Sequence, residues 1–87
     1  MKVYLTKKNC GDFIVITSKY DENITIISPI ICIDTMVGIA EINAKSLFSV
    51  MNLNLPNEYE VYIDTANKNK SDKFYKELEK FKKENKQ

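Results

Sequence analysis

The sequence predicts an α+β fold, and three stretches of its 87 residues carry that prediction. The run Ile24–Ile33 is rich in β-branched residues, which favour strands. Tyr59, Val61 and Ile63 alternate with polar neighbours, the pattern of a strand with one buried face. Near the end of the chain, apolar residues recur at helical spacing: Phe74, Tyr75, Leu78 and Phe81.

Composition predicts a single domain over residues 1–87. The hydrophobic fraction of 44% is enough for a small core. A formal net charge of +1 favours neither nucleic acid nor an acidic partner. The apolar stretch Ile24–Ile42 is interrupted by Pro29, Asp34 and Glu41, so we do not expect it to cross a membrane. The N-terminus does not read as a signal peptide, and we expect a cytoplasmic protein.

Two cysteines, Cys10 and Cys32, are too few for a disulfide framework or a metal site. We expect both to be reduced thiols, and we expect the protein to hold no metal and no cofactor.

The first elements leave one alternative open. Lys2–Thr6 alternates as a first strand, and Lys7–Gly11 reads as a loop. Asp12 is placed to cap a helix from Phe13 onward. However, the β-branched content of Phe13–Ser18 favours a strand, so residue propensity and the capping signal disagree here.

The middle of the chain predicts a long hairpin. After a turn at Tyr20–Asn23, the strand Ile24–Ile33 contains Pro29, which indicates a bulge or an edge position. Asp34–Thr35 forms the next turn, and Met36–Ile42 the next strand.

The tip of this hairpin, Ile30–Val37, is apolar and must pack on something. Either it folds back over its own sheet, or it pairs with a second copy as a homodimer.

A short helix is predicted at about Ser46–Leu53, with Ser46 as N-cap. Leu47, Val50 and Met51 fall on one helical face, which we expect to join the core. Pro56 ends the helical region.

The last helix is expected to follow a polar loop, Thr65–Lys70. Its N-cap would be Ser71 or Asp72.

The segment Asn43-Ala-Lys-Ser-Leu-Phe-Ser-Val-Met-Asn-Leu53, followed by the strand Glu60-Val-Tyr-Ile63, resembles HPr, the histidine-containing phosphocarrier protein of the sugar phosphotransferase system. Weaker similarity lies in Thr17–Asp21 and Asn23–Ile27. The resemblance implies an open-faced sandwich, in which a four-stranded antiparallel sheet carries helices on one face. It also implies a helix at Phe13–Ser18, and about nine extra residues that lengthen the hairpin between the second and third strands.

The resemblance also suggests a site. Ser46 matches the serine that HPr kinase phosphorylates in many Gram-positive bacteria, and Lys45, Leu47, Phe48 and Met51 would form a partner-binding surface. Whether Phe48 is an exposed contact or part of the core stays open at this point, as does the reading of Ser46 as no more than a cap.

The chain departs from the family in one decisive way: it has no histidine, and all 13 basic residues are lysine. Histidine phosphotransfer is therefore not implied. We expect a regulatory or adaptor protein rather than an enzyme, with a protein partner such as an HPr kinase-like or phosphotransferase-system protein. Two alternatives are a self-associating interaction domain and a cysteine-based carrier at Cys10, whose thiol would stand at a helix start.

Overall fold

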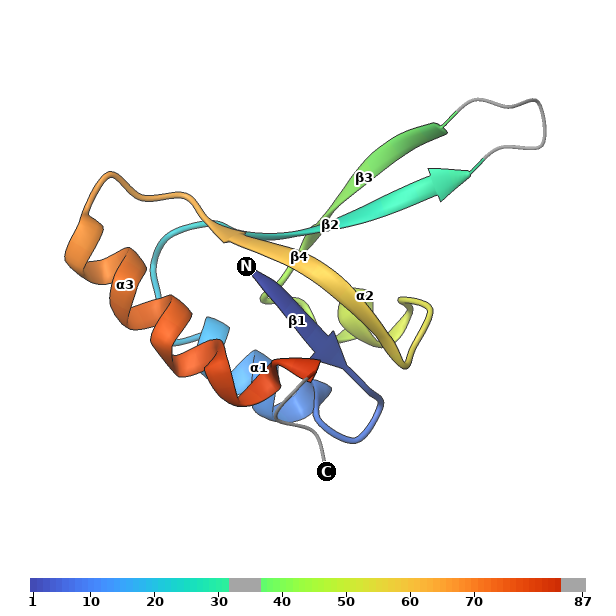
Figure 1. Ribbon diagram of the computed structural model, residues 1–87, viewed down its shortest axis with the longest axis horizontal. Coiled ribbons are helices and arrows are strands. Elements are labelled where there is room, and N and C mark those ends of the chain that lie inside the picture. Colours follow the sequence, from blue (N-terminus) through green and yellow to red (C-terminus); the bar gives the residue numbers. More distant parts are fainter. Residues whose placement is uncertain (32–36, 84–87) are drawn as a thin grey trace.

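Four strands form one antiparallel sheet in the order β1-β4-β2-β3, shown in Figure 1. The computed structural model describes residues 1–31 and 37–83. Along the chain the elements are β1 (Lys2–Leu5), α1 (Cys10–Thr17), β2 (Ile24–Ile31), β3 (Val37–Asn43), α2 (Leu47–Met51), β4 (Asn57–Ile63), α3 (Lys68–Glu77) and the 3-10 helix η1 (Leu78–Phe81).

The helices share one hydrophobic core with a single face of the sheet. Alternate strand residues are buried, as a period of two requires. Edge-to-face ring contacts between Phe13 and Phe81 and between Tyr20 and Phe74 join α1 and the α1–β2 connection to the C-terminal helices. The buried core consists of Val3, Leu5, Cys10, Phe13, Ile16, Tyr20, Ile24, Ile26, Ala44, Val50, Tyr59, Val61, Ile63, Phe74, Leu78 and Phe81. The opposite face is open, which confirms the predicted α+β open-faced arrangement.

The segment for which helix and strand were both open is helical. α1 buries Phe13, Ile16 and Thr17, which the helical spacing brings to one side. The Thr17 hydroxyl donates to the buried carbonyl of Ala44 at 2.9 Å. Burial of this face outweighs the strand propensity of the β-branched residues.

α1 begins at Cys10, so the predicted loop through Gly11 and the predicted cap at Asp12 were wrong. Two reciprocal hydrogen bonds between Thr6 and Asn9, directly before Cys10, fix the start of α1. The Thr6 amide donates to Asn9 Oδ1 at 2.8 Å, and the Asn9 amide donates to Thr6 Oγ1 at 3.0 Å. This exchange satisfies two backbone donors before the helix begins.

The predicted long hairpin is present, and Pro29 explains its shape. β2 pairs with β3 without interruption over Thr25–Ile31, which excludes a bulge at Pro29. β2 pairs with β4 only over Ile24–Ile27. The next β2 position on the β4 side is Pro29, which has no N–H to donate. From there the hairpin continues without β4, and it projects past the rest of the sheet (Figure 1).

Several sequence predictions lie outside the described residues. These are the turn at Asp34–Thr35, the thiol of Cys32, the Met36 end of the third strand and the central part of the predicted Ile30–Val37 dimer contact.

α3 begins at Lys68, so the predicted caps at Ser71 and Asp72 were wrong. Asn67 is the N-cap, because its Oδ1 accepts the Lys70 amide at 3.1 Å. The predicted apolar face is confirmed, with Phe74 fully buried.

Candidate functional site

The helix α2 exposes most of its apolar side chains. Phe48 is 79% exposed, Leu47 44% and Met51 48%, whereas Val50 is completely buried. We call the exposed side chains Leu47, Phe48 and Met51 the α2 patch. The structure thus resolves the open question of Phe48: it lies outside the core.

The expected core face of this helix was wrong for Leu47 and Met51. Helical geometry gives the reason, since successive residues turn by about 100°. With Val50 at the centre of the buried side, Leu47 and Met51 lie roughly 60° and 100° away, on the flanks. Phe48 lies roughly 160° away and faces solvent. α2 has only five residues, so one buried anchor sets its orientation.

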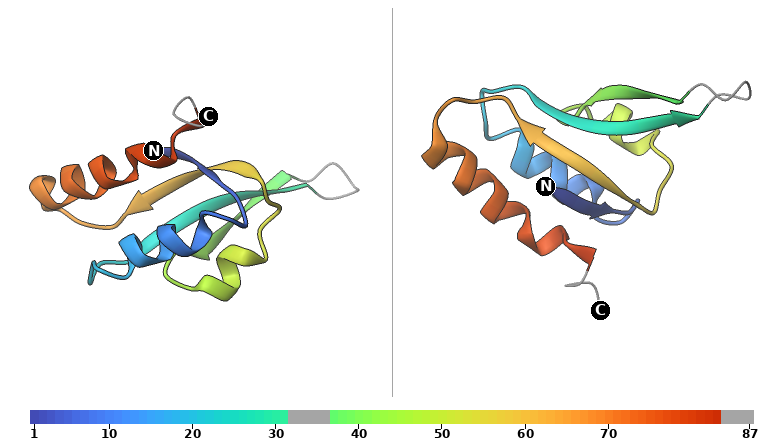
Figure 2. Two further views of the ribbon diagram at one scale, coloured as in Figure 1. Left: turned by 90° about the horizontal axis from the view of Figure 1, so that it is seen from below. Right: turned by 45° about the horizontal axis from the view of Figure 1, so that its top comes forward.

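α1 packs against α2, and the two helices lie side by side in Figure 2 (left). α1 contributes one further exposed apolar side chain, Val15, which is 64% exposed. The helical layer therefore presents large apolar side chains from two neighbouring elements, a composition typical of protein contact surfaces.

Ser46 caps α2, as the sequence predicted. Its Oγ accepts the Ser49 amide at 3.3 Å, and its backbone is extended. The side chain is partly exposed at the start of the α2 patch. A hydroxyl in this position can be reached from solvent while it holds the first turn.

Lys45 is directed away from the start of α2. Its ammonium donates to the Tyr20 carbonyl in the α1–β2 connection, and its amide donates to Asn43 Oδ1 at 2.9 Å. Lys45 also acts on Glu22 in this connection. The pKa of Glu22 lies below its ordinary value, mainly because Glu22 pairs with Lys70 at 2.8 Å, and the charge of Lys45 adds to this effect. The structure therefore places Lys45 with the α1–β2 connection rather than with Phe48.

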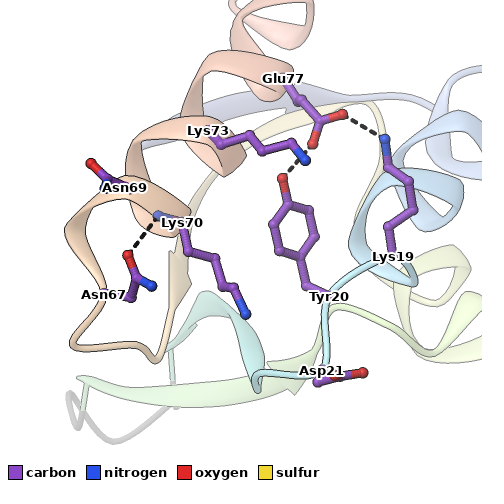
Figure 3. A pocket seen from close by; sticks show the side chains of 8 residues that line it. All are labelled: Lys19, Tyr20, Asp21, Asn67, Asn69, Lys70, Lys73 and Glu77. Carbon is purple, nitrogen blue, oxygen red and sulfur yellow. Dashed lines mark hydrogen bonds and ion pairs between the residues drawn. The ribbon is translucent and has the colours of Figure 1, made fainter.

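A second group of polar side chains surrounds a hollow of about 370 Å³ between the α1–β2 connection and α3, shown in Figure 3. Within this group, Glu77 connects two of the other side chains. Its carboxylate accepts hydrogen bonds from the Lys19 ammonium, at 2.5 Å, and from the Tyr20 hydroxyl. The residues that line the hollow are Lys19, Tyr20, Asp21, Asn67, Asn69, Lys70, Lys73 and Glu77.

These interactions shift two protonation equilibria in opposite directions. Hydrogen bonds from Lys19 and Tyr20 lower the pKa of Glu77. Burial, followed by the hydrogen bond to Glu77, raises the pKa of Tyr20 well above its ordinary value. Tyr20 thus stays a neutral donor and Glu77 a charged acceptor at neutral pH. Because Lys19 and Lys70 are both paired with carboxylates, we interpret this cluster as a structural clamp.

No local pattern in the sequence predicts the clamp. Lys19 and Glu77 are separated by 58 positions. Local spacing indicates a different partner, because Lys73 and Glu77 are four positions apart on one helix.

Cys10 is the first residue of α1 and is 2% exposed. Its thiol lies 3.4 Å from the Lys7 carbonyl oxygen, to which it can donate. The thiol is therefore enclosed by the protein rather than presented to a partner.

Residues 1–31 and 37–83 can also be described with respect to metal binding and membrane spanning. No group of three or more histidine, cysteine or acidic side chains there is arranged to hold a metal ion. No helix in the same ranges is long and apolar enough to span a membrane. Comparison of the chain with protein-family models, curated proteins and solved structures found no match.

Proposed function

We propose that this chain is an HPr-like regulatory or adaptor protein of the bacterial cytoplasm, which acts by binding other proteins and not by histidine phosphotransfer. The α2 patch is its contact surface, and Ser46 is the phosphoryl acceptor that controls it. The proposal combines the sequence resemblance around Ser46 with the exposure of the side chains that follow it.

The observation that carries the proposal is the exposure of Phe48. The Phe48 side chain is 79% exposed, so most of its apolar surface is not buried by the core of this chain. Contact with another protein would bury that surface. Aromatic side chains are among the residues that most often dominate binding energy at protein interfaces. Leu47 and Met51, each about half exposed, would flank the aromatic contact and exclude water from it.

Phosphorylation of Ser46 would change this surface directly. A phosphoryl group adds about −1.5 to −2 charges at pH 7. That charge would stand immediately beside Leu47, where an apolar partner surface would have to desolvate it. A partner with basic side chains near its apolar contact would instead be favoured. Either response makes Ser46 a switch for the choice of partner.

The direct test is the intact mass of the protein after two incubations. The first uses ATP and HPr kinase, and we expect a gain of one phosphoryl group that Ser46→Ala abolishes and Ser49→Ala preserves. The second uses phosphoenolpyruvate and the general phosphotransferase enzyme, and we expect no gain, because the chain has no histidine. A kinase reaction that leaves the mass unchanged, or a gain that survives Ser46→Ala, would refute the role of Ser46.

A second measurement tests the α2 patch itself. We expect Phe48→Ser to slow phosphorylation of Ser46 by roughly tenfold or more, the effect of losing one strong interface contact. Tyr62→Ser is the matched control, since Tyr62 is also an exposed aromatic residue but lies on β4, away from α2. Equal rates for both variants and the unmodified chain would remove the α2 patch from kinase recognition.

A further inference from the structure

The two edges of the sheet differ in how they are protected. β1, at one edge, has four residues, carries Lys2 and packs against η1, while the Lys83 ammonium lies 5.9 Å from the centre of the Tyr4 ring. β3, at the other edge, has seven residues and contains neither lysine nor proline. Short strands, lysines and covering segments are the usual protection against strand pairing, and β3 lacks all three within the described residues.

The backbone of β3 can be divided into an inner and an outer set. The Ala44 amide donates to the Ile24 carbonyl at 2.9 Å, which fixes the phase of the antiparallel ladder. Even-numbered residues of β3 therefore exchange hydrogen bonds with β2, and odd-numbered residues point their N–H and C=O groups outward. At Ile39 and Glu41 these outward groups have no partner among residues 1–31 and 37–83.

The side chains of β3 also favour contact. Ile39 is 64% exposed, although it is a large apolar residue in the middle of a strand. Gly38 and Ala40 are small, so a neighbouring strand can approach closely. Glu41 is the single charged residue of the strand. Beyond Ile27 the hairpin also projects past β4, so β3 can be approached without hindrance from the rest of the sheet (Figure 1).

From these observations we propose that β3 pairs antiparallel with β3 of a second copy of this chain. The result is a two-fold dimer with one continuous sheet of eight strands, four from each copy. When β3 pairs antiparallel with β3 of a second copy, the outward N–H and C=O groups of the two strands bond to each other. Both copies use the same edge, so neither has a second β3 edge to which a third copy could bind. The net charge of +1 per chain imposes little repulsion between the copies.

Because the outward N–H and C=O groups belong to odd-numbered residues, only some registers between the two β3 strands allow them to bond. If the two-fold axis passes beside Ala40, Ile39 of each copy lies opposite Glu41 of the other. This register keeps the two Glu41 carboxylates apart, whereas pairing Glu41 with itself would oppose like charges. The proposal concerns the β3 edge and does not depend on the α2 patch or on Ser46.

The test is sedimentation equilibrium of the full chain at protein concentrations from roughly 1 µM to 1 mM, a range that covers weak dimers. We expect a reversible monomer–dimer equilibrium. Glu41→Pro removes an outward N–H while leaving the bonds to β2, and Ile39→Glu places a second carboxylate opposite Glu41 of the other copy. We expect each variant to weaken dimerisation at least tenfold. Tyr62→Glu, an equivalent change on the interior strand β4, should leave the equilibrium unchanged.

Three results would overturn the proposal. The first is a chain that stays monomeric across the range, which would leave the edge to a strand from a different protein. The second is a dimer that Glu41→Pro and Ile39→Glu do not weaken. The third is open-ended association beyond a dimer, which a closed two-fold contact excludes. Circular dichroism of each variant shows that loss of dimer is not loss of the fold.

Discussion

The hydroxyl of Tyr20 donates a hydrogen bond to the carboxylate of Glu77, which lies 57 positions later in the chain. This bond joins the end of the α1 region to the last residue of α3. Lys19 completes the clamp from the same side. Both carboxylate oxygens of Glu77 are thereby used, and the position of α3 over the sheet depends on a charged group that can be titrated.

Stability should therefore fall in acid partly through Glu77. Its pKa is lowered in the folded state, so its contribution is complete above the ordinary carboxyl value of 4.5 and is lost as the pH falls below that value. We expect Glu77→Gln to lower the free energy of unfolding at pH 7 by about 1 kcal/mol, since Lys19 is half exposed to solvent. We also expect it to flatten the acid limb. Urea unfolding between neutral and acid pH measures both effects.

Glu58→Gln is the control for this experiment. Glu58 is exposed, and its carboxylate has no ion pair with the described residues. An acid limb that is the same in Glu77→Gln as in the unmodified chain would contradict the role assigned to the clamp.

The buried hydroxyl of Thr17 is a second long-range link, because it donates to the carbonyl of Ala44. Thr17→Val keeps the shape of the side chain but leaves this buried carbonyl without its donor. We expect a loss of about 1–2 kcal/mol in the free energy of unfolding. Thr25→Val, on the open face of β2, should change it by no more than about 0.5 kcal/mol. Equal effects would mean that the Thr17 bond adds nothing beyond side-chain volume.

These links mark the limit of what the sequence predicts. The strands and the apolar face of α3 follow from local periodicity, because burial repeats at a fixed spacing along one element. The helical state of α1 does not follow from residue propensity, which favours a strand; packing of Phe13, Ile16 and Thr17 decides it.

The candidate site divides in the same way. The cap at Ser46 is a local interaction, and the sequence predicted it. The outward position of Leu47 and Met51 depends on Val50 being the buried anchor, which no local pattern reveals. The direction of Lys45 toward Tyr20, 25 positions away, depends on the tertiary fold.

The contrast between Phe48 and Val50 should appear in stability measurements. Phe48→Ala removes a side chain that lies mostly in water, so we expect the free energy of unfolding to change by no more than about 0.5 kcal/mol. Val50→Ala opens space in the core and should cost about 2 kcal/mol. Urea unfolding of both variants checks the difference. A large loss with Phe48→Ala would place that ring in the core and remove the basis for the α2 patch.

Ser46 can be tested as a cap independently of any kinase. Ser46→Ala removes the acceptor for the Ser49 amide, and we expect a loss of about 0.5–1 kcal/mol, at the lower end for caps because the bond is 3.3 Å long and α2 has five residues. Ser46→Asp supplies another good N-cap acceptor and should retain nearly all the stability. Asn67→Ala, which removes the cap of the longer helix α3, provides the comparison. Thermal unfolding of the three variants ranks these costs. If Ser46→Ala is as stable as the unmodified chain, the hydroxyl does not hold α2, and phosphorylation would then act on the surface of the patch without disturbing the helix.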